Sequence, residues 1–215
     1  MKVALAGGGR LAHYLVEELP TFGIEPVILT RSKKPWFESH GIEQRLTDYS
    51  VQSLTKSLSD CDAVVSVILD YTMAFTEARL NLIKAAQESP KCRRFIPSEY
   101  GGDLEEQPDQ PLFYNANHEP VRKVLMEQNT LEWTIVSAGW FLDYLFPEDY
   151  RHYKGDIGEA FPLNIATKTV VIPGTGRELL DFVSARDASK GIGALLKAPQ
   201  GSWEPYTYLS GCSLC

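Results

Sequence analysis

The sequence has no long apolar segment and no excess of positive charge. Its 215 residues contain no apolar run near the ~20 residues that cross a bilayer. The formal net charge is −7 at pH 7, whereas a non-specific nucleic-acid binder presents basic surface to phosphates. The opening MKVALAGGGR is too short and too broken by glycine for a signal peptide. We therefore expect neither a membrane nor a nucleic-acid partner, and a cytoplasmic location.

The sequence also lacks the spacings of common metal and hydrolase sites. Its cysteines are Cys61, Cys92, Cys212 and Cys215, and the terminal Cys-x-x-Cys pair has no second pair to complete a zinc site. The histidines show neither His-x-His nor His-Glu-x-x-His spacing, and no Gly-x-Ser-x-Gly elbow occurs. We expect no bound metal, no serine hydrolase chemistry, and free thiols in a reducing compartment.

What the sequence does have is a regular alternation of apolar strands and amphipathic helices. Strands are expected at 2–7, 26–30, 44–48, 62–69, 93–98 and 131–139. Helices are expected at 10–23, 51–60, 73–89 and 118–129, with Pro120 in the first turn of the last one. This alternation predicts an α/β protein with a Rossmann-type doubly wound parallel sheet and helices on both faces.

The pattern loosens after residue 140, where aromatics, prolines and glycine-rich turns dominate. A strand and turn are expected at 167–176, a helix at 184–199 with Ser184 as its N-cap, and a strand at 206–211. We predict a dinucleotide-binding domain over 1–140. Residues 141–215 are predicted to form a small substrate-binding region interleaved with the last sheet elements.

A glycine-rich turn follows the first strand and opens the first helix. Gly7-x-Gly9-x-x-Ala12 has the Gly-x-Gly-x-x-Gly/Ala spacing of dinucleotide-binding proteins. Gly7 permits a tight turn, Gly9 lets the backbone approach a pyrophosphate, and Ala12 lets the helix pack closely on the strand. The helix start offers unpaired N–H groups to phosphate, so Arg10 and Leu11 are also assigned to the cofactor site. Glycine-rich turns that serve only backbone geometry are the competing interpretation.

The residues after the second strand indicate which cofactor binds. An NAD site places Asp or Glu at this point to bind the ribose 2′-hydroxyl. The sequence here is Thr30-Arg31-Ser32-Lys33-Lys34, which has no acid and three cations. Arg31 can meet a 2′-phosphate with a planar fork, and Lys34 can add a point charge. This favours NADP(H), with Thr30 and Ser32 in the same site, over a merely solvated basic loop.

Three further residues come at the carboxyl ends of expected strands, where ligands of open α/β sheets bind. Ile68 and Pro97 are predicted to contact the cofactor. Ser98 is predicted to orient the substrate or bind the cofactor amide. The competing interpretation is that Ser98 only shapes a turn.

Four stretches resemble one family of atypical short-chain dehydrogenases/reductases. They are the glycine turn, LTRS after the second strand, RFIPSEYGGD, and WTIVSAGWFLDYL. Together they resemble the NmrA-like and isoflavone-reductase-like families, while NHEPVRK and DIGEA resemble fungal members most. The resemblance covers nearly the whole chain and implies a Rossmann domain with a small C-terminal substrate region. Family chains usually continue several dozen residues beyond the equivalent of 206–211, so we expect a shortened substrate region.

The resemblance also directs attention to His118. Reductases of this group carry a lysine near the nicotinamide, at the start of the helix that follows the Pro-Ser-Glu-Phe/Tyr-Gly loop. Counting back from Val121-Arg122, that position is His118. His118 and Tyr114, four residues earlier, are the candidate proton donors for a developing anion, because histidine titrates near neutral pH. The competing interpretations are that His118 caps a helix and that Tyr114 packs on the sheet.

An aromatic run follows the sixth expected strand and lies at the same edge. Trp140, Phe141 and Tyr144 are predicted to wall a flat apolar substrate, or else to form a core for the C-terminal region.

Three functions fit these features. The first is an NADPH-dependent reductase that acts on the carbonyl, enone or imine of a small aromatic or polyketide-like secondary metabolite. The second is a non-catalytic NAD(P)-binding sensor similar to the NmrA regulators, which would bind a regulatory protein partner. The third is a cofactor-independent isomerase or cyclase on a reductase scaffold. If the protein is an enzyme, its expected partner is a small-molecule substrate. A homodimer is the expected self-association.

Overall fold

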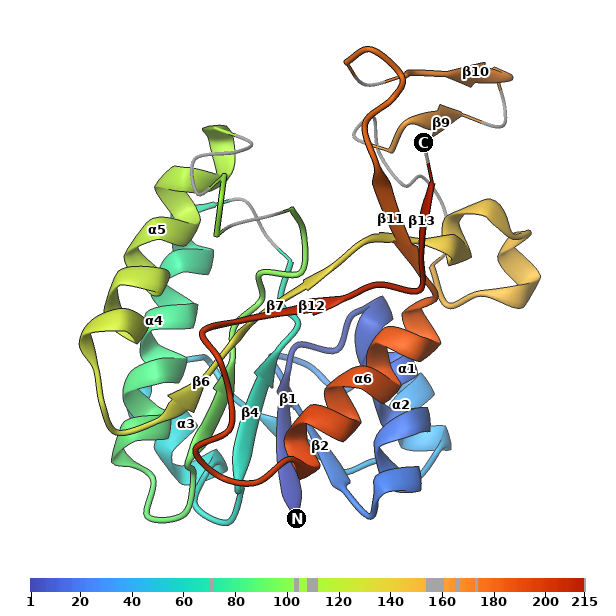
Figure 1. The fold of residues 1–215 in the computed structure, drawn as a ribbon. Coiled ribbons are helices and arrows are strands. Elements are labelled where there is room, and N and C mark those ends of the chain that lie inside the picture. The colour runs from blue at the N-terminus through green and yellow to red at the C-terminus, as the bar shows by residue number, and fades with distance from the viewer. Residues whose placement is uncertain are drawn as a thin grey trace.

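The computed structural model describes residues 1–69, 72–102, 105–107, 112–153, 161–164, 167–172 and 174–214. For residue 73 and residues 112–115 it describes the backbone alone. Within these ranges the chain forms a parallel sheet between two layers of helices, with smaller strand pairs built from residues after 140 (Figure 1).

The main sheet has six strands in the order β3-β2-β1-β4-β5-β6, and every pairing in it is parallel. The strands are β1 (Lys2–Ala6), β2 (Glu25–Thr30), β3 (Gln44–Leu46), β4 (Ala63–Ser66), β5 (Arg94–Ile96) and β6 (Glu132–Trp133). The order reverses between β1 and β4. In doubly wound sheets ligands bind outside the carboxyl ends of the strands at this reversal. The predicted Rossmann-type fold is confirmed.

Helices cover both faces of this sheet because the central strands β1, β2 and β4 are buried on both sides. The helices are α1 (Arg10–Glu18), α2 (Pro35–Ser39), α3 (Val51–Ser57), α4 (Met73–Glu88), α5 (Leu112–Glu127) and α6 (Ala185–Lys197). Side chains of β1 alternate between two cores: Ala4 and Ala6 pack with α3, α4 and α5, whereas Val3 and Leu5 pack with α1 and α6. Among the described helices, none is both long enough and apolar enough to cross a membrane.

Residues after 140 contribute to the main body and to small peripheral sheets. β7 (Ile135–Ala138) pairs in parallel with β12 (Tyr206–Leu209), and α6 packs against α1. The peripheral strands are β8 (Trp140–Phe141), β11 (Leu180–Val183), β13 (Cys212–Leu214), β9 (Leu163–Asn164) and β10 (Thr169–Val170). β11 lies between β8 and β13, and β9 pairs with β10 (Figure 1). The chain returns to the main body as α6 and β12 after β11, and then leaves it again as β13. The boundary at residue 140 stays a prediction.

The observed helix α5 corrects one expectation. It begins at Leu112 instead of residue 118, so Pro120 lies inside the helix and His118 cannot cap it. A proline in a helix interior costs roughly 3 kcal/mol because it removes a backbone hydrogen bond. Val121 and Leu125 are fully buried on this helix, and their packing offsets that cost. Sequence reasoning placed the boundary from the proline and did not weigh this burial.

Other boundaries also differ. The strand expected over 131–139 divides at Thr134, and the one over 167–176 shortens to β10. The short helix α2 and strands β8, β9, β11 and β13 were not predicted, because each has five residues or fewer and no clear period.

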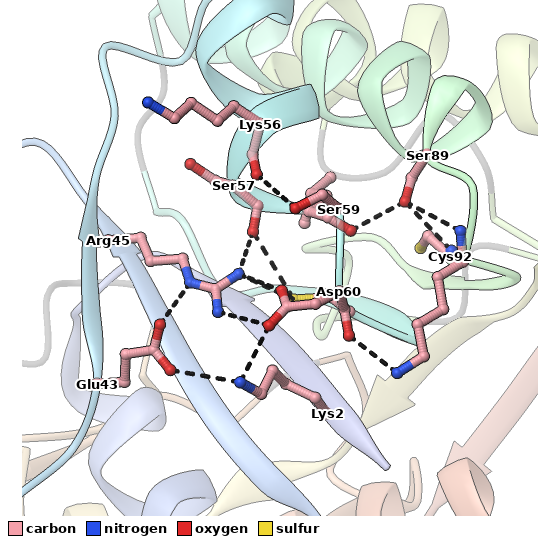
Figure 2. Close-up of polar contacts among 12 residues, drawn as sticks. Lys2, Glu43, Arg45, Lys56, Ser57, Ser59, Asp60, Ser89 and Cys92 are labelled. Carbon is pink, nitrogen blue, oxygen red and sulfur yellow. Dashed lines mark hydrogen bonds and ion pairs between the residues drawn. The ribbon is translucent and has the colours of Figure 1, made fainter.

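Charged residues close the amino ends of the strands in an ion-pair network (Figure 2). Lys2 Nζ lies 3.1 Å from Asp60 Oδ2 and 3.5 Å from Glu43 Oε2. Arg45 pairs with Asp60 at 2.5 Å and with Glu43 at 2.7 Å. The hydrogen bond from Arg45, supported by Lys2, holds the pKa of Asp60 well below its usual range. Every charge in this network has an opposite partner.

Candidate functional site

The glycine turn lies at the carboxyl end of β1 and cannot accept a side chain at its first position. Gly7 has φ +112°, a conformation that L-residues rarely adopt, and its N–H donates to the Leu29 carbonyl at 3.0 Å. A Cβ atom on Gly7 would lie 3.2 Å from the backbone of Val67 and Ile68. The turn therefore fits closely between β2 and the end of β4.

Gly9, unlike Gly7, has room for a side chain. A Cβ there would meet nothing nearer than the Val67 carbonyl oxygen at 3.9 Å, so packing alone does not demand glycine. Gly9 is the N-cap of α1, makes no side-chain cap, and is exposed with Arg10. Leu11 and Ala12 are buried beneath it and fix the helix on the sheet. The first N–H groups of α1 consequently have no capping side chain.

The end of β2 turns one polar side chain inward and leaves the basic ones outside. Thr30 is buried, and its Oγ1 donates to the Ser32 carbonyl at 2.9 Å. Arg31, Ser32 and Lys34 are exposed. Among the described residues, Arg31 makes no hydrogen bond or ion pair; its guanidinium lies 5.9 Å from the centre of the Tyr49 ring. Arg31 is thus presented at the sheet edge without an ion-pairing carboxylate among the described residues, although Asp48 and Glu77 also line the adjoining cleft.

An open cleft of about 780 Å³ adjoins Arg31. Its wall is formed by the end of β3 and the starts of α3 and α4, and its lining includes Arg31, Thr47, Tyr49, Ala78 and Asn81. Tyr49 has φ +63°, and its hydroxyl donates to the Leu29 carbonyl at 2.9 Å. Burial raises the pKa of Tyr49 to about 12, so this hydroxyl stays protonated as a donor. This hydrogen bond connects Tyr49, which lines the cleft, to the end of β2.

Ser98 and Ile68, predicted from separate strands, do meet. The Ser98 hydroxyl donates to the Ile68 carbonyl at 2.8 Å, and Pro97 is buried beside them after β5. The Tyr100 hydroxyl donates to the Ser66 carbonyl at 2.9 Å, and burial raises the pKa of Tyr100. These bonds hold the loop after β5 against the end of β4.

A buried cluster of charged groups lies behind that loop. Arg79 of α4 forms an ion pair with Glu99 and donates to the Ser98 carbonyl at 3.2 Å. His118 Nδ1 lies 2.9 Å from Oε1 of Glu99. The relative exposures of Arg79, Glu99 and His118 are 1%, 2% and 7%. Desolvation lowers the pKa of Arg79, against the opposing effect of Glu99. His118 is therefore a buried member of a charge cluster.

The other proton-donor candidate, Tyr114, lies on the same helix as His118, but its side chain is outside what the structure describes. Its predicted role in proton transfer stays a prediction.

The aromatic residues of the predicted substrate wall pack on one another. The Trp140 and Tyr144 rings lie 5.3 and 5.2 Å from Phe161, and Phe141 lies 5.4 Å from Tyr153. Trp140, Phe141 and Tyr144 are all partly exposed. They form one aromatic cluster at the junction of the main sheet and the peripheral strands.

Sequence reasoning missed Arg79, Glu99 and the buried Asp143. Asp143 accepts from the Tyr14 hydroxyl at 2.5 Å and from the Ala185 N–H at 2.6 Å, which joins α1, the aromatic cluster and α6. The Pro-Ser-Glu-Tyr-Gly motif contained Glu99 and could have signalled it. No local pattern distinguishes Arg79 from a surface arginine on an amphipathic helix. Among the described residues, no three His, Cys, Asp or Glu side chains gather as a metal site would require.

Comparisons with known proteins agree with this arrangement. The NAD(P)H-binding family model matches residues 7–166. Oxidoreductase swnR of Metarhizium robertsii is 52% identical over 215 residues, which is all of this chain and 70% of swnR. Isoflavone reductase homolog A622 of Nicotiana tabacum is 29% identical over 202 residues, covering 86% of this chain and 61% of the relative.

Solved structures share the fold. AtPrR2 with NADP+ and (+)pinoresinol superposes with a TM-score of 0.72 at 22% identity, over 96% of this chain and 69% of that one. The family model spans most of the chain, and the relatives include isoflavone reductase homologues. The chain belongs to the NAD(P)H-binding family, and its relatives include an oxidoreductase and isoflavone reductase homologues.

Proposed function

We propose that this protein is an NADPH-dependent reductase that acts on a carbonyl, enone or imine of a small aromatic or polyketide-like metabolite. The observation that carries the proposal is the composition of one sheet edge. The glycine turn, the exposed Arg31, which has no ion pair among the described residues, and the Ser98–His118 region all lie at the carboxyl ends of β1, β2, β4 and β5. This is the edge at which doubly wound proteins bind dinucleotides.

The residues present fit NADPH. The bare Gly9 and the first N–H groups of α1 suit a pyrophosphate. Arg31 would hold the 2′-phosphate, for which it has no competing carboxylate among the described residues. The cleft beside it is the natural place for the adenosine, with the Tyr49 ring and the short Ala78 in its wall. NADP+ in the AtPrR2 structure supports this choice of cofactor.

Bound NADPH would supply a hydride to the substrate, which then requires a proton. His118 is the proposed source of that proton, because the resemblance puts it at the position of the family's lysine and an imidazole can act as a general acid. Ser98 is held by its bond to Ile68 and keeps its loop against the sheet edge. Trp140, Phe141 and Tyr144 would face a flat substrate with partly exposed rings.

The proposal is tested by titrating NADPH and NADH against the protein and then following absorbance at 340 nm with quinones, enones and imines. We expect tight NADPH binding and oxidation with at least one class. A failure to bind either nucleotide would remove the basis of the proposal. His118→Gln serves as the control for chemistry, since it should reduce turnover without changing nucleotide affinity.

A second candidate is a non-catalytic NAD(P)-binding sensor with a protein partner. Two observations favour it: His118 is only 7% exposed, and the aromatic rings are engaged with one another. Tight NADPH binding without oxidation by any substrate class is the result expected of a sensor.

A further inference from the structure

One buried arginine connects the residues to which catalysis is assigned. Arg79 Nη2 contacts both the Ser98 carbonyl and the Glu99 carboxylate, and that carboxylate faces Nδ1 of His118. We propose that Glu99 is a positioning residue, which fixes the tautomer and orientation of His118 so that the proton passes through Nε2. The proposal rests on the proposed function only in that His118 exchanges a proton with a substrate.

The tautomer follows from the chemistry of Glu99. A fully buried carboxylate needs a charged partner, and Arg79 supplies one that remains protonated because arginine does not lose its proton in proteins. An ionised carboxylate only accepts hydrogen bonds. At 2.9 Å from its oxygen, Nδ1 of His118 must therefore carry a proton. The neutral ring then has Nε2 as its basic nitrogen.

The cluster is poorly explained as a device for stability. Buried ion pairs contribute to stability only when their remaining polar atoms are also hydrogen-bonded. Among the described residues, Nε and Nη1 of Arg79 and Oε2 of Glu99 are buried without a hydrogen-bond partner. An apolar pair of similar size would serve packing at least as well. The presence of Arg79 and Glu99 here is better explained by their effect on His118.

Neighbouring groups define the environment of the ring. Phe75 of α4 lies 6.0 Å from the His118 ring and 4.8 Å from the Arg79 guanidinium. Arg122 and Glu119 on α5 pair at 3.6 Å, and the positive charge of Arg122 adds to desolvation in lowering the pKa of Arg79. The Glu99 carboxylate lies within hydrogen-bonding distance of Nδ1, at 2.9 Å.

The resembling reductases carry a lysine where this chain carries His118. A histidine at this position requires such positioning. A lysine ammonium has three equivalent rotatable donors and no tautomers. An imidazole has two distinct nitrogens, and the partner of one decides the protonation of the other. In this chain Glu99 is that partner. A histidine-based site therefore needs an acceptor for Nδ1 in the loop after β5, which a lysine-based site does not need.

Nitrogen-15 NMR of the histidine side chains tests the proposal without nucleotide or substrate. The signals of His118 are assigned by their loss in His118→Gln. We expect the neutral His118 ring of the wild-type protein to be the Nδ1–H tautomer. Finding it predominantly as the Nε2–H tautomer would overturn the proposal, and this result needs no variant at position 99.

Two variants extend the test. In Arg79→Met/Glu99→Leu both charges are removed together, so no unpaired ion remains buried. We expect loss of the Nδ1–H preference and a fall in kcat of roughly 10- to 1,000-fold, with KM for NADPH unchanged. Glu99→Gln keeps a neutral acceptor and should restore part of both properties. Glu127→Gln is the matched control, because it removes an exposed carboxylate of α5, paired with the exposed Lys123 at 3.9 Å, and should change neither.

The outcomes separate the two proposals. An unchanged tautomer or unchanged kcat in the double variant would reject the role of Glu99 even if NADPH is oxidised. The expected tautomer in a protein that never oxidises NADPH would reject the reductase while leaving Glu99 as the group that orients His118.

Discussion

The two ends of the parallel sheet differ in whether their charged groups are paired. At the amino ends, two cations, Lys2 and Arg45, pair with two carboxylates, Glu43 and Asp60, in a closed network (Figure 2). At the carboxyl ends, Arg31 is exposed without an ion pair among the described residues, and the start of α1 has no capping side chain. Paired charges at one end serve the fold. Unpaired cations and bare N–H groups at the other end are what an anionic ligand requires.

Replacing Gly7 should have the largest effect, because it breaks the carboxyl edge itself. In Gly7→Ala the residue keeps a strained φ of +112° and its Cβ presses on Val67 and Ile68. We expect a loss of about 1–3 kcal/mol in unfolding free energy. NADPH affinity should fall roughly 100-fold as the phosphate contacts are displaced.

Gly9→Ala is the matched comparison, since its Cβ meets no atom nearer than 3.9 Å. Its stability should change by less than about 0.5 kcal/mol while NADPH binding still weakens. Urea unfolding and nucleotide titration measure both effects. Equal loss of stability in the two variants would show that the turn has only a structural role.

Arg31→Ala tests the comparison between the two sheet ends by removing one charge from the carboxyl end. Removal of a charge-assisted contact to the 2′-phosphate should weaken NADPH binding by roughly 10- to 100-fold, since such bonds contribute about 1.5–3 kcal/mol. NADH affinity and stability should not change, because Arg31 is exposed and carries no ion pair among the described residues. Lys33→Ala is the control, since Lys33 pairs with Glu38 at 3.6 Å. Equal weakening of NADPH and NADH would reject the phosphate assignment.

Asp60→Asn should have the smallest effect and should act only on the fold. The side chain is 48% exposed, so we expect a loss of about 1 kcal/mol at pH 7 after allowing for solvent screening. A lowered folded-state pKa stabilises above the unfolded value of about 3.9, and this contribution disappears as pH falls through the folded pKa. The difference between wild type and variant should therefore shrink below about pH 4. Urea unfolding at several pH values tests this, and a changed NADPH affinity would show that the two sheet ends are coupled.

The fold and the cofactor edge were readable from local patterns. Alternating apolar strands and amphipathic helices gave the doubly wound sheet, and the spacing from Gly7 to Ala12 gave its first turn. The boundaries failed where packing outweighed a local signal. Pro120 marked a helix start in the sequence, yet α5 continues through it because Val121 and Leu125 are buried.

Only part of the candidate site could be predicted from the sequence. Ser98 and Ile68 were assigned to one sheet edge, and the structure shows them hydrogen-bonded there because the ends of adjacent parallel strands share that edge; their predicted contacts with the cofactor and substrate stay predictions. Asp143 gave no such signal, because its partners Tyr14 and Ala185 lie far from it along the chain.

The sequence by itself determined the class of fold, the place of the glycine turn and the basic character of the β2 end. Each of these depends on residues within a few positions of one another. Only the tertiary structure decided that Arg79, Glu99 and His118 form one buried cluster. Their contact depends on how α4, α5 and the loop after β5 pack, and the chemistry of His118 depends on the low dielectric and the fixed partner that this packing creates.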